Sequence, residues 1–136
     1  MDNLSKLERS RVMSNVRGKD TRPEIAIRSL IHSLGYRYRL HDKSLPGCPD
    51  LVFSARRCVI LVHGCFWHQH TCAAGNRRPK SRQVFWNAKL ESNVTRDRRH
   101  LRKLRRLGWR VLVIWECQVK PKNLLKIEKT IRRFLR

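Results

Sequence analysis

The fold of this chain centres on one stretch, which reads Cys58-Val59-Ile60-Leu61-Val62-His63-Gly64-Cys65-Phe66-Trp67-His68-Gln69-His70-Thr71-Cys72. Its first five residues are apolar and mostly β-branched, which is typical of a buried strand. The stretch then holds three histidines, two cysteines and two adjacent aromatic residues. A structural zinc site needs four ligands, so this segment offers more donors than one zinc ion requires.

The residues before this stretch predict a second strand. Asp50-Leu51-Val52-Phe53 is apolar after its first residue, and four residues separate it from Cys58, so the two runs most simply form a hairpin. With the turn centred in those four residues, Asp50 lies opposite Leu61 to His63. The hairpin therefore brings Asp50 beside Val62 and His63.

The remaining elements follow from apolar periodicity and from the residues that start and stop each run. Thr21-Arg22-Pro23-Glu24 indicates a capping box that opens a helix ending at Gly35, and Ser81 is expected to cap a long helix that ends at Gly108. We also expect strands at 36–40 and 110–117, the latter the most buried, and a closing amphipathic helix at 124–135. This order predicts an α/β fold with a mixed β-sheet flanked by helices.

Composition points to a polyanion as the partner. Thirty-two Lys and Arg against ten Asp and Glu give a net charge of +22 within 136 residues, which we interpret as one domain. Residues 1–20 form a basic segment, either a helix over Ser5–Val16 or an arm that orders on DNA. No apolar run is long enough for a membrane span, so we expect no membrane partner. The odd count of five cysteines favours reduced thiols in the cytoplasm, with metal binding.

A four-ligand zinc site is predicted from strand lengths. Val59 to Cys65 and Val111 to Cys117 have equal lengths, so two parallel neighbouring strands would bring both cysteines to the same end of the sheet. Cys65, His70, Cys72 and Cys117 would then hold structural Zn²⁺. Cys48 and Cys58 are expected to be small buried hydrophobic residues. The alternative is a set of unligated buried thiols beside surface histidines.

The donors left over suggest hydrolysis of a phosphodiester. Asp50 offers a carboxylate for Mg²⁺, and His63 or His68 an imidazole that can activate water. Asp97 lies on an otherwise apolar helix stripe and needs a partner such as His68, because a lone buried carboxylate is costly. Other interpretations stay open: Asp50 as a turn residue, Glu24 as a cap, and Asp97 as a solvated residue. Phe66, Trp67 and Trp86 are either core residues or rings that stack on bases.

Short strings spread along the chain carry a family resemblance. They are Arg9-Ser10, Met13, Asp20-Thr21, Glu24, Leu45-Pro46-Gly47, Pro49-Asp50, His63-Gly64-Cys65-Phe66-Trp67-His68, Phe85-Trp86, Asn93-Val94, Arg96-Asp97-Arg98-Arg99, Leu107-Gly108-Trp109-Arg110-Val111 and Trp115-Glu116-Cys117. These strings resemble the very short patch repair (Vsr) endonucleases over nearly the whole chain up to Cys117. The resemblance implies a restriction-endonuclease-like fold and Mg²⁺-dependent nicking of one strand beside a T:G mismatch, the product of 5-methylcytosine deamination.

The resemblance also assigns roles to individual residues. Asp50 and the Val62 backbone carbonyl would bind Mg²⁺, His68 paired with Asp97 would be the general base, and Glu24 and His63 would hold water or the phosphate. Cys65, His70, Cys72 and Cys117 would hold zinc. The expected DNA contacts are Phe66, Trp67 and Trp86 as a wedge from the major groove, Met13 from the minor groove, and Lys89 and Asn93 near the mismatch.

Two rival functions remain at this point. One is a restriction-type nuclease that cuts both strands of undamaged duplex DNA, which usually requires a dimer. The other is a zinc-stabilised DNA-binding module that does not cleave. For the nicking enzyme we expect a monomer at the nucleoid in the cytoplasm of a prokaryote, with mismatch-repair proteins as further partners.

Overall fold

A computed structural model describes residues 21–73 and 75–136, so the predictions on residues 1–20, Met13 included, lie outside the described residues. Four strands form one sheet in the order β1-β2-β3-β4. Their bounds are Arg39–Leu40 (β1), Leu51–Phe53 (β2), Cys58–His63 (β3) and Arg110–Trp115 (β4). The first two pairings are antiparallel and β3 pairs with β4 in parallel, so the predicted mixed sheet is confirmed.

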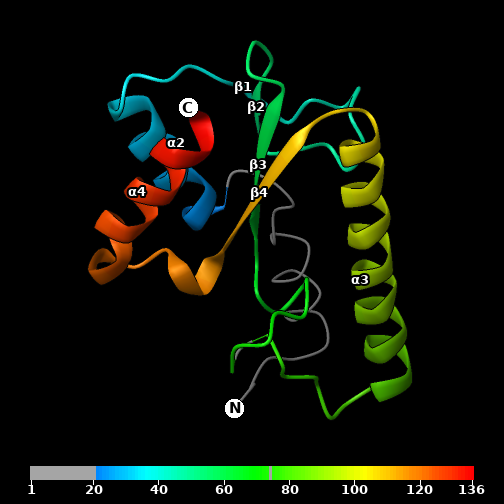
Figure 1. Ribbon diagram of the computed structural model, residues 1–136. Coiled ribbons are helices and arrows are strands. Elements are labelled where there is room, and N and C mark those ends of the chain that lie inside the picture. The colour runs from blue at the N-terminus through cyan, green and yellow to red at the C-terminus, as the bar shows by residue number, and fades with distance from the viewer. Residues whose placement is uncertain (1–20, 74) are drawn as a thin grey trace.

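The helices lie on both faces of this sheet. Helix α3 (Gln83–Arg106) connects the parallel strands β3 and β4 and covers one face, because parallel neighbours require a long crossover. Helices α2 (Arg22–Ser33) and α4 (Leu124–Leu135) cover the other face (Figure 1). None of the described helices combines the length and the apolar character needed to cross a lipid bilayer.

Two apolar clusters result from the alternation of side chains along β3. Cys58 and Ile60 pack with residues of α2 and α4, whereas Val59 packs with Leu104 and Trp109 on the α3 side. On the first face, Ile27, Ile31, Ile127, Ile131 and Leu135 are buried, which confirms the predicted apolar stripes of α2 and α4. The same alternation places His63, four residues after Val59, on the α3 side of the sheet.

The hairpin and the start of α2 form as the sequence predicted. Leu51 pairs with Ile60, so the preceding Asp50 lies opposite Leu61. Thr21 is the N-cap of α2, and its side chain accepts a hydrogen bond from the Glu24 backbone N–H at 3.4 Å. Gly35, with φ of 94°, follows the end of this helix in a conformation that costs glycine little.

Several local predictions were wrong. The N-cap of α3 is Arg82 with φ of 53° and no side-chain cap, not Ser81. Strand β4 buries only Ile114 because β4 has a single neighbour in the described sheet, whereas β3 is the strand buried almost throughout. The predicted strand at 36–40 is reduced to Arg39–Leu40, and residues 116–118 form a 3₁₀ turn instead of continuing β4. Cys48 is exposed, although Cys58 is buried as expected.

Candidate active site and thiol–imidazole cluster

The segment after β3 turns back on itself within a few residues. The His68 N–H donates to the Gly64 carbonyl at 3.1 Å, and the His70 N–H donates to the Cys65 carbonyl at 3.0 Å. Gln69 has φ of 49°, which is an uncommon conformation for a residue other than glycine. This tight winding sends His68 and His70 to different neighbours, His68 to α3 and His70 to the end of β4.

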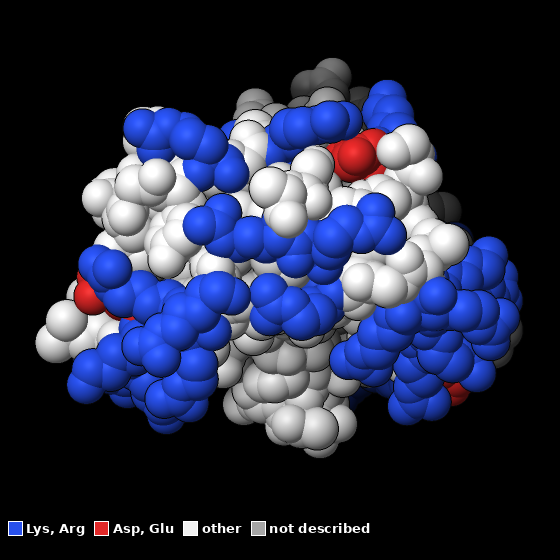
Figure 2. All heavy atoms as spheres, turned by 45° about the horizontal axis from the view of Figure 1, so that its top comes forward, with Lys and Arg blue, Asp and Glu red and all other residues white. Residues whose placement is uncertain are grey.

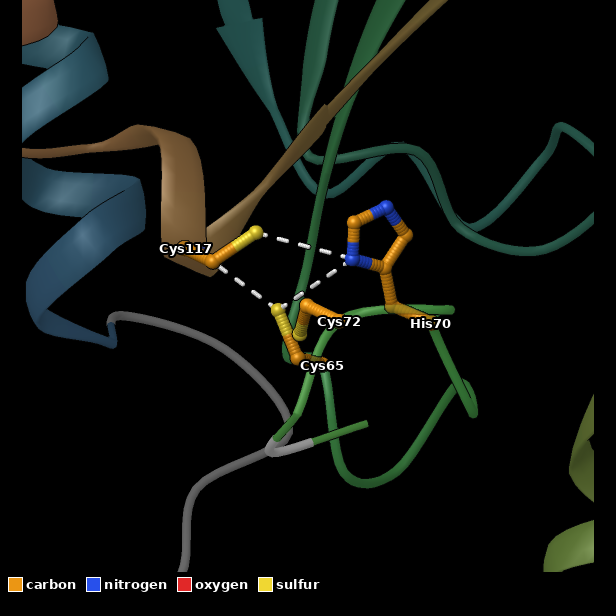
Figure 3. Close-up of side chains that lie close together, drawn as sticks. All are labelled: Cys65, His70, Cys72 and Cys117. Carbon is orange, nitrogen blue, oxygen red and sulfur yellow. Dashed lines mark hydrogen bonds between the residues drawn. The ribbon is translucent and has the colours of Figure 1, made fainter. Parts of the chain in front are cut away.

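A thiol–imidazole cluster forms where β3 and β4 end (Figure 3). Cys65, His70, Cys72 and Cys117 each direct a donor atom to one place, and these atoms lie within 4.8 Å of one another. Cys65 and Cys117 meet because the parallel register pairs Val59 with Val111 and brings both strands to the same edge. The Cys117 backbone N–H donates to Cys65 Sγ at 3.3 Å. The structure therefore brings together the four residues predicted as zinc ligands, including Cys65 and Cys117, which the strand lengths had paired.

The geometry of this cluster fits a tetrahedral metal ion. The Nδ1 atom of His70 lies 3.9 Å from Cys65 Sγ and 3.5 Å from Cys117 Sγ. Neighbouring donors around a tetrahedral zinc ion are about 3.5–3.8 Å apart, given Zn–S near 2.3 Å and Zn–N near 2.0 Å. The hydrogen bond from His70 lowers the pKa of the Cys72 thiol to about 6, whereas burial raises the pKa of Cys65 to about 12. Three thiols and one imidazole directed to one place are a donor set that could hold a metal ion.

The backbone around the cluster is closely packed. A Cβ atom at Gly75 would lie 2.2 Å from the His70 carbonyl oxygen, so no larger residue fits there without a backbone shift. The Gly75 N–H donates to Cys72 Sγ at 3.4 Å, and the ring of His70 stacks on Trp115 with centroids 4.2 Å apart. These contacts hold the segment in place at the end of the sheet.

A second group of donors surrounds Asp50. The Val62 backbone N–H donates to Asp50 Oδ2 at 2.7 Å, as the hairpin register requires. Burial raises the pKa of the Asp50 carboxyl to about 7, a rise that the Val62 hydrogen bond opposes and the Glu24 carboxylate increases. Glu24 is 2% exposed, and its Oε2 atom contacts Arg28 at 2.6 Å and His41 Nε2 at 2.8 Å. The side chain of Glu24 is therefore directed into the protein interior rather than acting only as a helix cap.

His41 is a further member of this group that the sequence did not indicate. Its ring and the carboxylates of Glu24 and Asp50 place one donor atom each within 4.8 Å of one another. The residue follows β1, and its N–H donates to the Asp50 carbonyl at 3.2 Å, so the sheet brings it beside Asp50. No local motif marks His41, because Glu24 lies on α2 and Asp50 directly precedes β2, and only the packing of these elements brings them to His41.

A third group joins the turning segment to α3. The rings of His63 and His68 stack with centroids 3.8 Å apart and planes within 3°. His68 Nδ1 lies 2.5 Å from Asp97 Oδ2, which gives this carboxylate on the apolar stripe of α3 a partner. Burial, with the nearby His68 second, lowers the pKa of His63 to about 4, so His63 is a neutral imidazole at neutral pH. The arrangement offers one oriented imidazole and one neutral imidazole side by side.

Residues of the group around Asp50 and of the group formed by His63, His68 and Asp97 line one cavity of about 360 Å³. Its lining includes five histidines and aspartates already described, and also His100: His41, Asp50, His63, His68, Asp97 and His100. Gly47, with φ of 77°, lets the loop before Asp50 approach α3, since a Cβ there would lie 2.9 Å from the His100 ring. His100 follows Asp97 by three residues, and this spacing on one helix face could have identified it from the sequence.

An aromatic cluster lies beside this cavity. Phe66 lies 5.1 Å from Trp67 and 5.9 Å from Trp86 between ring centroids, and all three rings are partly exposed. The amide of Asn93 donates to the Trp67 carbonyl at 3.2 Å, so this buried side chain supports the cluster from α3. Lys89 is exposed on the same helix. The structure thus gathers the rings that the sequence assigned to a wedge.

Comparison with known proteins identifies the family. A model of the family described as "DNA mismatch endonuclease Vsr" matches residues 1–74. The type II nicking enzyme V.XorIIP of Xanthomonas oryzae pv. oryzae is 51% identical over 134 residues, covering 98% of this chain and 96% of the relative. The DNA mismatch endonuclease Vsr of Escherichia coli is 43% identical over 128 residues, covering 94% of this chain and 81% of the relative. With the cavity and its carboxylates and imidazoles, these matches show that the chain belongs to the Vsr family of DNA endonucleases, which hydrolyse phosphodiester bonds.

Proposed function

We propose that this protein nicks one strand of duplex DNA beside a T:G mismatch, with Mg²⁺ at Asp50 and structural Zn²⁺ in the thiol–imidazole cluster. The observation that carries the proposal is the cavity that Asp50, His63, His68 and Asp97 share, next to the cluster of Phe66, Trp67 and Trp86. The E. coli relative is named a mismatch endonuclease and the Xanthomonas relative a nicking enzyme. The mixed sheet with its hairpin aspartate agrees with a restriction-endonuclease-like fold.

The Asp50 group suits a divalent cation. Two carboxylates, of Asp50 and of the almost completely buried Glu24, lie close together, and the Glu24 carboxylate raises the cost of ionising Asp50. A cation relieves this repulsion, and Asp50 with the Val62 carbonyl would hold Mg²⁺, which prefers oxygen ligands. When bound, Mg²⁺ supplies positive charge that stabilises the phosphate as negative charge develops on it. The contact with His41 fixes the position of the Glu24 carboxylate.

Proton transfer is assigned to His68. Its Nδ1–H donates to Asp97, which fixes the ring and leaves Nε2 with a lone pair. That lone pair accepts a proton from the attacking water, and Asp97 stabilises the imidazolium that results. His63 stays neutral because it is buried, and it can donate one hydrogen bond to the phosphate or to the water without adding charge. Glu24, whose carboxylate lies within 4.8 Å of that of Asp50, would hold a water molecule beside it.

Zinc acts as a brace in this proposal. Along the chain, Cys65 directly precedes Phe66, Trp67 and His68, and His70 and Cys72 follow them. Cys117 connects this segment to the end of β4. A metal at the four donors therefore fixes the positions of the catalytic imidazole and the aromatic rings relative to each other. Zn²⁺ is the ion we propose because four Cys and His donors in tetrahedral arrangement are its preferred structural site.

Mismatch selection is assigned to the aromatic rings. Inserting Phe66, Trp67 and Trp86 from the major groove, with Met13 from the minor groove, costs a few kcal/mol of unstacking. The cost is least at a weakened T:G pair, and that difference provides the selectivity. Lys89 lies one helical turn after Trp86 and can contact DNA there, while Asn93 acts by holding Trp67. The cavity holds one set of catalytic groups, which fits a monomer acting on chromosomal DNA in the cytoplasm, alone or with mismatch-repair proteins.

The test is a nicking assay on end-labelled duplexes that differ in one base pair, T:G against C:G, with Mg²⁺ or EDTA. We expect one strand of the T:G duplex to be cut in Mg²⁺ only. Asp50→Asn should abolish cutting, and Glu91→Gln, which changes an exposed carboxylate on α3, should not. Equal cutting of both duplexes would refute mismatch selection. Linear product from closed circular DNA would favour the restriction-type rival, and absence of any cleavage would favour the binding module.

A further inference from the structure

Two residues of the cavity lining have no part in the proposed catalysis. His100 lies on α3 one helical turn after Asp97, and Lys43 lies in the loop between β1 and β2. Within residues 21–73 and 75–136, neither side chain makes a hydrogen bond or an ion pair with another residue. Both side chains are therefore available to a ligand that enters the cavity.

The ring of His100 is held in place by the loop that precedes Asp50. A Cβ atom at Gly47 would lie 2.9 Å from His100 Nδ1 and 3.0 Å from its Cγ atom, so the backbone of the loop packs on this edge of the ring. Gly47 permits this close approach because it has no side chain and adopts φ of 77° at little cost. The second ring nitrogen, Nε2, lies at the tip of the ring, beyond the atoms that Gly47 contacts, and is the nitrogen that can meet a ligand.

A tight turn fixes the backbone around Lys43. The Asp42 carboxylate accepts hydrogen bonds from the backbone N–H of Ser44 at 2.9 Å and from its hydroxyl at 2.6 Å. A carboxylate that binds the backbone two residues later closes a local turn, and Lys43 is the residue between them. The side chain of Lys43 is exposed and lines the cavity. Lys43 thus adds a cation to the lining.

The surroundings of His100 favour an anion. Burial is the main cause of the lowered pKa of its imidazole, and the nearby Arg96 lowers this pKa further, so the ring is neutral at neutral pH. Asp97 opposes the shift, but its carboxylate is already paired with His68. A neutral imidazole can donate one hydrogen bond, while Arg96 and Lys43 supply positive charge. The place therefore suits an anion with oxygen acceptors.

The anion that enters this cavity in a DNA endonuclease is a backbone phosphate. Lys and Arg cover much of the face seen in Figure 2, with few Asp or Glu between them, so the surface attracts DNA over a wide area. That charge does not fix where the strand lies, whereas a contact inside the cavity does. Phosphates of one strand follow each other about every 3.4 Å of the helix axis. With the scissile phosphate at Asp50, a neighbouring phosphate of the same strand lies beside it.

We propose that His100 and Lys43 bind a phosphate next to the scissile one on the strand that is cut. The Nε2–H of His100 donates to a phosphate oxygen, and the Lys43 ammonium group pairs with the phosphate charge. The contact holds the strand so that the scissile phosphate lies between Asp50 and His68. The inference rests on the proposed function, because it takes the cavity as the place of nicking, and it adds residues that hold the strand without cleaving it.

Duplexes with a single methylphosphonate locate this contact. A methylphosphonate replaces one charged phosphate oxygen by a methyl group, and each T:G duplex of the set carries it at a different phosphate flanking the scissile one. Nicking is measured in single turnover with enzyme below saturation, where the rate reports kcat/KM. At one flanking position, wild type should nick the modified duplex about ten-fold more slowly, as expected for the loss of a hydrogen bond to a charged group.

Two variants identify the residues in contact. Below saturation, His100→Asn and Lys43→Gln should each nick the unmodified duplex about ten-fold more slowly. The rate with saturating enzyme should stay near that of wild type, because the contact holds the substrate and the transition state alike. On the modified duplex neither variant should lose more than wild type loses, because their shared partner is already gone. Lys43 is exposed, so its variant tests the inference even if His100→Asn lowers stability.

A matched substitution controls for the loss of a histidine. His32 is exposed on α2 and is not part of the cavity lining. His32→Asn should nick the unmodified duplex at the wild-type rate and should lose the same factor as wild type on the modified duplex.

The inference is overturned if no flanking methylphosphonate slows wild type, or if the loss of either variant adds to the loss that the methylphosphonate causes. A lower rate with saturating enzyme would also overturn it, since His100 or Lys43 would then act in the chemical step. If T:G and C:G duplexes are nicked equally, the same measurements on C:G duplexes test the contact.

The proposed catalytic cavity has a separate test in the same assay. Asp50→Asn that nicks at the wild-type rate would overturn the cavity as the active site, and this inference with it. An inactive Asp50→Asn together with additive losses in the His100 and Lys43 variants would overturn only the phosphate contact, so the two failures are distinguishable.

Discussion

The thiol–imidazole cluster and the carboxylate–imidazole cavity both depend on the ten residues from His63 to Cys72. The cluster takes Cys65, His70 and Cys72 and completes its donors with Cys117 at the end of β4. The cavity takes His63 and His68 and completes its groups with Asp97 on α3 and Asp50 on the hairpin. The first set consists of three thiols and one imidazole around one point, while the second consists of carboxylates and imidazoles that line a cavity. One short segment thus supplies side chains to two sites because it lies between β4 and α3.

The comparison predicts that a substitution in the cavity lowers the nicking rate without affecting the metal content of the thiol–imidazole cluster. Asp50→Asn keeps an acceptor for the Val62 N–H but removes the charge proposed for Mg²⁺, so single-turnover nicking should fall by at least about 1,000-fold, of the order expected for loss of metal-ion stabilisation. The zinc content of the variant, measured by elemental analysis, should equal that of wild type. A loss of zinc together with activity would contradict the separation of the two regions.

The pair of His68 and Asp97 should show a graded loss. Replacing His68 by Gln removes the proposed base and should lower the nicking rate by about 100- to 1,000-fold, a usual range for a general base. Asp97→Asn keeps an oxygen that can accept the Nδ1–H hydrogen bond and should cost less, because it removes only the charge that would stabilise the imidazolium. Single-turnover nicking rates of the two variants and of wild type test this, and a wild-type rate for Asp97→Asn would show that Asp97 is only structural.

Damage to the thiol–imidazole cluster should mainly affect stability. Cys117→Ser removes the one cluster donor on the β4 side and should lower Tm by about 10 °C, corresponding to about 3 kcal/mol for a chain of this size. Metal content should fall with it. Cys48→Ser changes an exposed thiol outside the cluster and serves as the control, with Tm and metal content as in wild type. Equal metal content in both variants would reject Cys117 as a ligand.

The smallest expected effect is the change in thermal stability with pH that the Asp50 carboxyl causes. Burial raises the pKa of Asp50 from its ordinary value to about 7, so the folded protein binds more protons than the unfolded chain between about pH 4 and 7. Stability from this group is therefore present at low pH and is lost as pH rises toward 7. Without added Mg²⁺, Asp50→Asn should melt a few degrees above wild type at pH 8, and the gap should narrow at pH 5.

His63 contributes to the pH dependence of stability with the opposite sign. The effect of Asp50 must therefore be measured as the difference between wild type and Asp50→Asn. The pKa of His63 is lowered to about 4, so the unfolded chain binds more protons below pH 6.5 and stability falls with decreasing pH. Because this contribution is common to wild type and Asp50→Asn, it cancels in the difference between their Tm values. A gap that stays constant from pH 5 to 8 would show that Asp50 does not titrate in this range.

Local rules were sufficient where each partner lies nearby in the chain or at a matching place on a neighbouring strand. The Asp50–Val62 contact followed from a four-residue turn, and the meeting of Cys65 with Cys117 followed from equal lengths of two parallel strands. These predictions succeeded because strand register is fixed by side-chain alternation. The predictions of the N-cap of α3 and of the burial of β4 were wrong. The left-handed cap at Arg82 and the number of neighbours of a strand depend on tertiary packing.

By itself, the sequence determined the mixed α/β architecture, the family and the division of the ten-residue segment between the donors of the thiol–imidazole cluster and the two imidazoles of the cavity. Only the tertiary structure decided that His41 joins Glu24 and Asp50, that His100 lines the cavity, and that Glu24 is directed inward. It also decided that α3 and α4 end beside the β2–β3 turn, where Arg57 donates to the Leu107 carbonyl and Arg56 to the Leu135 carbonyl. The reason is physical: periodicity and turn chemistry act over a few residues, whereas these contacts join residues of different elements that only the packing of the chain brings together.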